Sequence, residues 1–276
     1  MKFWQKGTIV SRYNQDKVEA MLPPVSDEHF GFNNEARFWV GRVATKSVVD
    51  APGIHDSLLQ FRGNVYVREC GFLPENSLDS KGRESDSDDL RSLLFSAVEK
   101  YTDDGETGAR VVGSSRIIMK DSDQILPIEN YFPEVFKKFP AEGNISSEIS
   151  RYIARHPNKF VQGLVSLALV RAMFNVCIQE GIENAYAMLE EKPLNKLRRT
   201  GIEANDIGSS KYIAELKGVI QPVVFRPFEL VNTLYAESAD VDQPLTASQI
   251  FFQFDQNKDG HGFYNEDLMR KDHDIS

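Results

Sequence analysis

The chain contains little cysteine and no long apolar run, and both absences narrow what it can be. Its 276 residues include two cysteines, Cys70 and Cys177, so we expect two packed apolar thiols rather than a disulfide framework. No stretch reaches about eighteen apolar residues, and the most apolar region, residues 160–178, is interrupted by Gln162 and Arg171, which predicts a buried helix rather than a membrane span. The N-terminus lacks the apolar core of a signal peptide. We therefore expect a cytoplasmic protein of a bacterial cell.

Positive charge is also scarce. Lys and Arg number 32 against 41 Asp and Glu, which gives a formal net charge of -9. Residues 237–276 carry nine acidic and three basic side chains, so most of the excess belongs to the C-terminal tail. This acidity argues against nucleic acid as a partner. The five histidines are scattered along the chain, without metal-ligand spacing.

The tail also holds a calcium-loop pattern, DQNKDGHGFYNE, at residues 255–266. Ca²⁺ takes about six to eight oxygen ligands, which this spacing can supply from one short loop. Gly260 permits the sharp turn, and a water would fill the ninth position, where Phe263 has no ligating atom. The expected ligands are the side chains of Asp255, Asn257, Asp259 and Glu266 and the backbone carbonyl of His261.

The pattern resembles a single EF-hand covering about residues 246–271, because apolar residues at helical spacing flank the loop on both sides. A solvated acidic turn is the plainer alternative. The eighth position is Gly262, where the EF-hand family has an aliphatic residue that pairs with a second loop, and no second loop exists in this sequence. Calcium affinity is then low, or the hand pairs with the rest of the chain or with a second copy, as a homodimer.

The rest of the chain predicts an α/β sandwich with an antiparallel front half, because strands and helices do not alternate regularly. A polar linker, residues 236–244, separates it from the tail, so we expect a catalytic domain at 1–235 and a linker with a small helix-loop-helix calcium hand at 236–276. We read residues 74–89 as a polar loop or site cover. Strands are expected at 38–47, 90–101, 109–120, 146–154, 184–189 and 218–225, and helices at 54–70, 157–180 and 192–201.

Charged residues interrupt two of these apolar strands: Arg116 in the first, Glu148 and Arg151 in the second. Burying an ionised side chain in a sheet is costly unless it is paired or used. A structural ion pair and a functional site are both open on spacing alone. Residues 148 and 151 fall on opposite faces of a regular strand, so a common site requires a bulge.

Four blocks in order carry a family resemblance: RGNVYVRECGFLP, ESDSDD, GARVVGSSRIIM with LPIENYF after it, and SEISRYIA. Across about residues 44–227 the chain resembles the acyl-homoserine-lactone synthase and N-acyl amino acid synthase branch of the GNAT acyltransferases. The resemblance implies a mixed sheet flanked by helices and transfer of an acyl chain from an acyl carrier protein thioester to an amine. The positions that it matches are Arg62, Tyr66, Phe72, Glu84, Asp86, Asp89, Arg116, Glu148 and Arg151.

The acceptor amine distinguishes the two branches. Lactone synthases use S-adenosylmethionine, whereas N-acyl amino acid synthases use free amino acids. Phe72 stands where the lactone synthases usually carry tryptophan, and residues 184–202 look more like the amino acid synthases, which we favour. The loop ARHPNKFVQG is poor in glycine and would make a weak anion nest, which favours a carrier-protein donor over coenzyme A. A third alternative is a non-catalytic calcium-binding regulator on a GNAT scaffold.

Each candidate residue has an expected role. Glu148 is the first candidate for the base, with Glu69 as the second. Backbone N–H groups near Gly113 and Ser114 would stabilise the oxyanion, and Arg116 or Arg151 would hold the acceptor's carboxylate. The acidic block would position a loop or attract the amine, unless it is a solvated loop. A basic helical face would dock acyl carrier protein; a face that is only solvated is the plainer alternative. A lipid product implies peripheral membrane contact. That face comprises Lys192, Lys196, Arg198 and Arg199.

Overall fold

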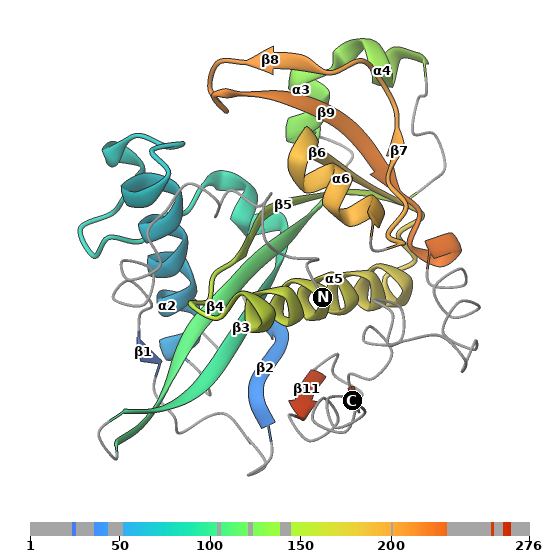
Figure 1. Ribbon diagram of the computed structural model, residues 1–276. Helices are drawn as coiled ribbons and strands as arrows, with labels where there is room; N and C mark the ends of the chain where they lie inside the picture. The colour runs from blue at the N-terminus through green and yellow to red at the C-terminus, as the bar shows by residue number, and fades with distance from the viewer. Residues whose placement is uncertain are drawn as a thin grey trace.

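The computed structural model describes residues 24–25, 36–43, 52–103, 106–120, 124–138, 145–199, 201–230, 255–256 and 262–265 (Figure 1). The described strands form one mixed sheet in the order β10-β11-β2-β3-β4-β5-β6-β9-β7, with β1 paired to β4 and β8 to β9. The strands are β1 (Pro24–Val25), β2 (Ala36–Val43), β3 (Ser92–Asp103), β4 (Glu106–Met119), β5 (Ser146–Ala154), β6 (Asn184–Glu190), β7 (Asn205–Asp206), β8 (Lys211–Ile213), β9 (Gly218–Phe225), β10 (Asp255–Gln256) and β11 (Gly262–Asn265). The helices are α2 (Pro52–Gly63), η3 (Asn64–Glu69), η4 (Glu75–Ser77), η5 (Ser87–Arg91), α3 (Pro127–Tyr131), α4 (Pro133–Lys138), α5 (Lys159–Gln179) and α6 (Glu191–Arg199).

Helix α5 is the centre of the main core. The Asn158 side chain caps its first turn by accepting a hydrogen bond from Phe160 N at 2.9 Å, and Gly181 follows its last turn with φ 69°. Most of its residues are buried against the sheet. A Cβ at Gly113 of β4 would lie 2.8 Å from Val165 Cγ1, so glycine lets this helix approach the strand closely.

The predicted buried helix is confirmed. Among the described residues α5 is the one helix long and apolar enough to cross a membrane, and 83% of its most apolar window is buried inside the protein. Such burial is what a core helix requires. Cys177 lies in this core with its thiol pKa raised by burial to about 12, and no disulfide joins it to Cys70, which is also described.

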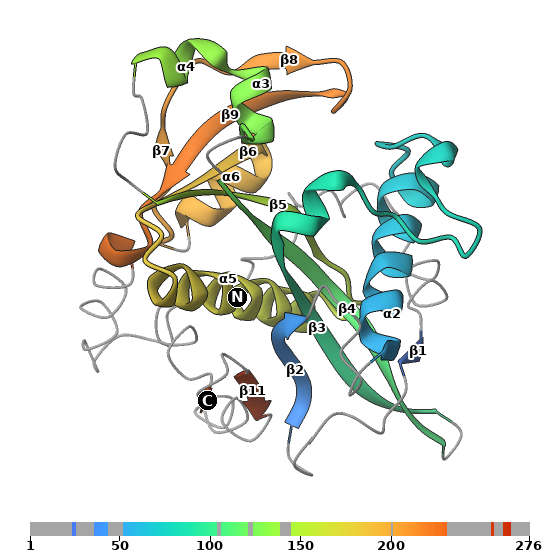
Figure 2. The same ribbon diagram turned by 180° about the vertical axis from the view of Figure 1, so that it is seen from behind.

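The sheet changes character at β5. Strands β2 to β5 run antiparallel, whereas β5 and β6 are parallel and pair from Ser146 with Asn184 to Ile149 with Ala187. Beyond that point the two strands diverge, because β5 stays paired with β4 while β6 stays paired with β9. Figures 1 and 2 show β6, α6, β8 and β9 on one side of this divergence and α2 on the other. A cavity is therefore possible in the middle of the sheet.

The bulge that a common site requires is present in β5. Ser150 pairs with Arg116 and Ile153 with Ser114. Between these two pairs β5 advances by three residues and β4 by two, which is a β-bulge in β5. Arg151 lies in this bulge with φ 52°, a left-handed conformation that is rare for a residue with a side chain. The bulge turns Arg151 out of the regular alternation of the strand.

The predicted mixed α/β fold is confirmed, and most elements lie where the sequence indicates them. The strand expected at 146–154 and the one at 218–225 have the observed bounds of β5 and β9. The helix expected at 54–70 is right in extent, but its last part is the π-helical segment η3. Helices α3 and α4 and strands β7 and β8 are not in the sequence prediction, because each is only two to six residues long.

The C-terminal tail is described in two short pieces. Strands β10 and β11 pair antiparallel, with Asp255 opposite Phe263, and β11 adds to the sheet edge with Gly262 opposite Val40 of β2. The helices expected on either side of the calcium loop lie outside the described residues, as do most of its expected ligands. The eighth loop position, which lacks a partner loop in the sequence, thus has the edge of the main sheet as its strand partner.

Candidate active site

A cavity of about 240 Å³ lies where β5 and β6 diverge. Its floor is β5 from Glu148 to Arg155, and the other walls come from η3 and the residues after it, α5, β6, α6 and β9. The lining is mainly apolar, with a few polar groups gathered on β5. An apolar cavity with few convergent polar groups is the usual form of a small-molecule site.

Glu148 is the carboxylate at the point of divergence. It is 1% exposed, lines the cavity, and its Oε2 accepts a hydrogen bond from Ile128 N of α3 at 2.7 Å. Burial raises the pKa of Glu148 to about 8, although the Ile128 N–H and the charge of Arg116 act in the opposite direction. A carboxyl group with a pKa near neutrality can both take and return a proton at physiological pH.

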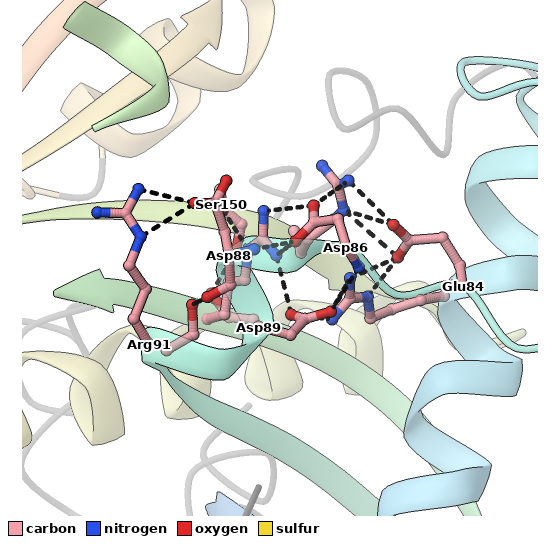
Figure 3. Close-up of polar contacts among 11 residues, drawn as sticks. Glu84, Asp86, Asp88, Asp89, Arg91 and Ser150 are labelled. Atoms are coloured by element: carbon pink, nitrogen blue, oxygen red, sulfur yellow. Dashed lines mark hydrogen bonds and ion pairs between the residues drawn. The ribbon is translucent and has the colours of Figure 1, made fainter. Parts of the chain in front are cut away.

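Three arginines and three carboxylates form a closed network beside this carboxylate (Figure 3). Arg62 of α2 donates through Nε to Glu84 Oε2 at 2.6 Å and through Nη1 to Asp89 Oδ1 at 2.8 Å. Arg116 of β4 donates through Nη1 to Asp86 Oδ1 at 2.5 Å and to Asp89 Oδ1 at 2.8 Å. The network joins α2, the central strand β4 and the segment around η5.

Arg151 completes the network from the bulge of β5. Its Nη2 donates to Glu84 Oε1 at 3.0 Å and to Asp86 Oδ2 at 2.9 Å, and its guanidinium lies 5.3 Å from the centre of the Tyr66 ring. Arg116 also donates through Nε to Ser150 Oγ at 2.8 Å, on the strand position next to Arg151. These contacts bring Arg116, Ser150 and Arg151 to one face of the sheet, which the bulge makes possible.

The network fixes the charge state of its acids. Burial alone would raise the pKa of Asp89, but the charges and hydrogen bonds of Arg62 and Arg116 lower it to about 2. For Asp86, burial is likewise outweighed by the hydrogen bond and charge of Arg116, and its pKa is lowered. Three positive and three negative groups balance, so the network is a structural clamp with no net charge. Residues 74–89 form an irregular segment that contains η4 and the start of η5, as a loop would. The capping box of Asp86 and Asp89 and these ion pairs hold the acidic block in place, so it is not a solvated loop.

The remaining sequence-predicted residues fall into two groups. Tyr66 and Phe72 line the cavity, with ring centres 6.4 Å apart. Gly113 and Ser114 do not line it; the close approach of α5 accounts for the glycine. Burying Arg116 behind its acidic partners likewise removes it from the lining.

The second candidate base is occupied elsewhere. Glu69 accepts a hydrogen bond from Arg155 Nη2 at 2.6 Å, and both side chains are almost fully buried. Glu69 is not among the lining residues. Because Glu69 is held by Arg155 and lies outside the lining, Glu148 is the one of the two candidates that is positioned to act as base.

The basic face of α6 is divided by the structure. Lys192 and Arg199 are exposed, whereas Arg198 donates to Ala204 O and Asp206 Oδ1. Lys196 instead lines the cavity, and burial followed by the nearby charge of Lys159 lowers its pKa to about 8. The face is therefore smaller as a docking surface than its sequence indicates.

The sequence alone does not point to Ser150, which lines the cavity, or to Tyr131, which does not line it but feels the charge of Glu148. Ser150 accepts the Arg116 hydrogen bond and lines the cavity. Tyr131 of α3 is half-buried, and its pKa is raised by burial and by the charges of Glu215 and Glu148. A serine or a tyrosine carries no sequence signal of a site by itself. Ser150 does lie between Glu148 and Arg151, and its spacing from Glu148 places both side chains on the same face of a strand.

The expected calcium ligands cannot be placed with this site. Asn257, Asp259, His261 and Glu266 lie outside the described residues, and of Asp255 the backbone alone is described. Within the part of the chain that the structure describes, there is no cluster of three or more His, Cys, Asp or Glu side chains suited to a metal ion. The calcium loop remains a prediction from the sequence.

The strand order, the divergence of β5 from β6 and the helix packing form a GNAT-like fold, as the comparison with solved structures shows. No family model matches the sequence, and no curated protein matches it. Among solved structures, the CoA-dependent acyl-homoserine lactone synthase BjaI, with SAM and isopentyl-CoA, is similar at 18% identity and a TM-score of 0.54, over 78% of this chain and 99% of BjaI. The CoA-dependent acyl-homoserine lactone synthase MesI is similar at 16% identity and a TM-score of 0.52, over 71% of this chain and 94% of MesI. FeeM, an N-acyl amino acid synthase from uncultured soil microbes, overlaps less, at 12% identity and a TM-score of 0.39, over 52% of this chain and 72% of FeeM.

Proposed function

We propose that the protein is an N-acyltransferase that moves a long acyl chain from a thioester to the amino group of an amino acid. The observation that carries this proposal is the position of Glu148, a buried carboxyl of raised pKa in the wall of a mainly apolar cavity. A base at this point is suited to an amine, and apolar walls are suited to an acyl chain. A purely structural role leaves the raised pKa without a use.

The chemistry of this site would run in two stages. Glu148 takes a proton from the acceptor's ammonium, and the freed amine attacks the thioester carbonyl. The attack forms the C–N bond and a tetrahedral oxyanion. Collapse of the oxyanion breaks the C–S bond, and the nitrogen gives up a second proton to the leaving thiolate, which departs as a thiol. Backbone groups of β5 beyond Ile149 lie at the cavity and have no partner on β6, so they replace the segment around Gly113 as the donors proposed for the oxyanion.

The proposed donor is acyl carrier protein. Its support is the loop that follows β5, where residues 155–158 contain no glycine and so offer a poor backbone nest for a pyrophosphate. The phosphopantetheine arm of a carrier protein has one phosphate rather than the pyrophosphate of coenzyme A. BjaI and MesI are described as CoA-dependent, so coenzyme A thioesters are the comparison donors.

A second candidate is an acyl-homoserine lactone synthase that uses S-adenosylmethionine. Its support is the likeness of fold to BjaI, whose structure holds SAM. Phe72, which lines the cavity in the place of the tryptophan expected for lactone synthases, favours the amino acid acceptor. Both candidates share Glu148 as base and differ in what enters the cavity.

The deciding experiment supplies purified protein with acyl carrier protein loaded with a long acyl chain, and with each amino acid or S-adenosylmethionine in turn. We expect a fatty amide with at least one amino acid, detected by mass spectrometry. Product from S-adenosylmethionine alone would support the lactone synthase, and no product from any donor and acceptor would favour the non-catalytic calcium-binding scaffold. A second experiment uses mass spectrometry on lipid extracts from cells that express the protein, with and without added calcium. The cells supply substrates that the purified assay omits.

We also propose that calcium binds residues 255–266 and modulates this activity. The support is the spacing of oxygen-bearing side chains in the sequence, together with the pairing of β11 with β2, which ties this segment to the catalytic sheet. Calorimetry should show calcium binding that Glu266→Gln weakens at least about tenfold, since that change removes the bidentate ligand. Equal rates in excess chelator and in millimolar-scale calcium would reduce the loop to a structural role.

A further inference from the structure

Two walls of the cavity meet at one polar contact. Lys217 Nζ, at the tip of the β8–β9 hairpin, donates a hydrogen bond to the carbonyl oxygen of Gly71, which follows η3. The two residues are 146 positions apart in the sequence. In Figures 1 and 2 this hairpin reaches across toward the part of the molecule that contains α2. The contact therefore bridges the two sides of the divergence.

The bridge lies at the rim of the cavity. Phe72 and Leu73, which come directly after Gly71, line the cavity, and so does Leu216, which comes directly before Lys217. The ammonium group is thus held next to the segments that carry these three apolar lining side chains. Glu148 and Arg151 line the same cavity from β5.

The partners of the positive groups around the cavity favour Lys217 as the group that meets an incoming anion. Arg62, Arg116 and Arg151 are each bound to two carboxylates of the network. Within the described residues Lys217 makes no ion pair, and its hydrogen-bond acceptor is a neutral carbonyl. A carboxylate would be a stronger acceptor for an ammonium than a peptide carbonyl.

The cations that line the cavity have different surroundings. Arg155 is paired with Glu69, and Lys196 approaches from α6 near Lys159, with α6 packed through Leu194 into the core that α5 forms. Lys196 therefore belongs to the α5 side of the sheet. Lys217 instead reaches the rim of the cavity from the β8–β9 hairpin, beside Phe72 and Leu73.

The backbone at Lys217 is consistent with a use for its side chain. Lys217 has φ 51° in a turn closed by its own N–H to Ala214 O at 3.1 Å. Glycine suits this left-handed conformation better than any residue with a Cβ. A lysine at such a position indicates that the side chain contributes something that glycine would lose.

We propose that Lys217 binds the carboxylate of the acceptor, and that in the substrate-free protein it closes the rim of the cavity through Gly71. The acceptor's carboxylate replaces the Gly71 carbonyl as the partner of the ammonium, so one event opens the rim and orients the amine toward Glu148. This inference rests on the proposed function and names the residue that selects an α-amino acid over an uncharged amine. It applies equally to free amino acids and to S-adenosylmethionine, since both carry an α-carboxylate.

The test compares the preferred amino acid with its carboxamide, which keeps the amine and removes the negative charge. Wild type, Lys217→Met and Lys217→Arg are assayed with both acceptors, and Lys211→Met, an exposed lysine on the same hairpin, is the control. Removing a charged hydrogen-bond partner should raise KM for the acid at least about tenfold in Lys217→Met. KM for the carboxamide should stay within about twofold of wild type, and kcat should change little for either acceptor.

The result is the ratio of KM for the acid to KM for the carboxamide in each variant. The carboxamide also alters the reactivity of the amine, but it does so equally in every variant. Lys217→Arg should retain much of the preference for the acid, and Lys211→Met all of it. A KM that rises equally for both acceptors would mean that Lys217 only closes the rim of the cavity, and it would overturn carboxylate binding. An unchanged KM ratio in a Lys217→Met protein with wild-type circular dichroism would also overturn it. A wild type that makes no product from any acceptor would instead remove the proposed function, and this inference with it.

Discussion

A single carboxyl group connects the fold to the chemistry. Glu148 sits on the last stretch of β5 that pairs with β6, one residue before the strands diverge at Ile149. Its backbone is fixed by two neighbouring strands while its side chain reaches the cavity. The same burial that raises its pKa also keeps water from competing for the proton. Position and protonation thus have one structural cause.

Glu148→Gln should abolish the proposed base while keeping the volume of the side chain. We expect kcat to fall about 10²- to 10⁴-fold, with KM for the acceptor little changed. In wild type the rate at saturating substrate should rise with pH and level off above a pKa near 8, because the carboxylate is the active form. The measurement is a pH profile of kcat.

The control for this experiment is Glu190→Gln, a carboxamide at the far end of β6 that also lines the cavity. It should keep the shape of the profile. Wild-type activity in Glu148→Gln would exclude Glu148 as base while leaving the fold and the acyl-transfer proposal intact.

At the scale of elements, the central feature is the clamp that joins α2, η5, β4 and β5. Arg62 is 0% exposed although it carries a full charge, so removing its charge leaves Glu84 and Asp89 buried with one arginine partner fewer each. Breaking a buried ion pair on one side costs far more than breaking an exposed one. The clamp should therefore dominate the stability of this part of the fold.

Arg62→Met should lower the free energy of unfolding by about 3–5 kcal/mol. Arg83→Met is a matched control, since Arg83 is a partly exposed arginine that bridges Asp56 and Asp79, and it should cost no more than about 1 kcal/mol. Urea unfolding followed by circular dichroism measures both. Similar losses in the two variants would mean that the clamp contributes no more than surface ion pairs.

The elements that the sequence predicts well are those with long apolar patterns. Strands β5 and β9 and helix α5 have periodicities that their burial enforces. The charged interruptions at Arg116, Glu148 and Arg151 indicate a shared site, and the need for a bulge follows from strand geometry alone. What the sequence does not reveal is which charges cancel one another. Arg116 and Arg151 look available for a substrate until the structure pairs both with the acidic block.

Contacts between distant segments are also beyond the sequence. Nothing near Gly71 indicates a lysine 146 residues away, and β11 has no pattern that selects β2 as its partner. Short elements such as α3 matter for the same reason. Ile128 supplies the one backbone hydrogen bond to Glu148 that the structure describes, from a helix of five residues that periodicity cannot detect. Tertiary packing sets these features.

At the scale of the whole molecule, two groups with opposite pKa shifts define a window of stability. The pKa of Asp89 is lowered from 3.8 to about 2, so its contribution is present above pH 4 and is lost as the pH falls through about 2. The pKa of Glu148 is raised from 4.5 to about 8, so its contribution is complete below pH 4.5 and is lost as the pH rises through about 8. Folding and catalysis therefore make opposite demands on Glu148, because the base works only in the form that the fold disfavours.

As far as these two groups govern it, the free energy of unfolding should accordingly be greatest near pH 4 and fall on both sides, with the alkaline decline running from about pH 4.5 to about pH 8. Glu148→Gln cannot ionise, so it should lose the alkaline decline and become more stable than wild type above pH 8, by an amount on the order of a few kcal/mol. Asp89→Asn should instead flatten the acid side, because an amide has no proton to gain. Denaturant unfolding between pH 3 and pH 9 measures all three proteins. If Glu148→Gln and wild type instead run in parallel between about pH 5 and pH 8, the carboxyl group of the folded protein already ionises near its unfolded pKa, and its ability to accept a proton at neutral pH would rest on solvent access rather than on burial.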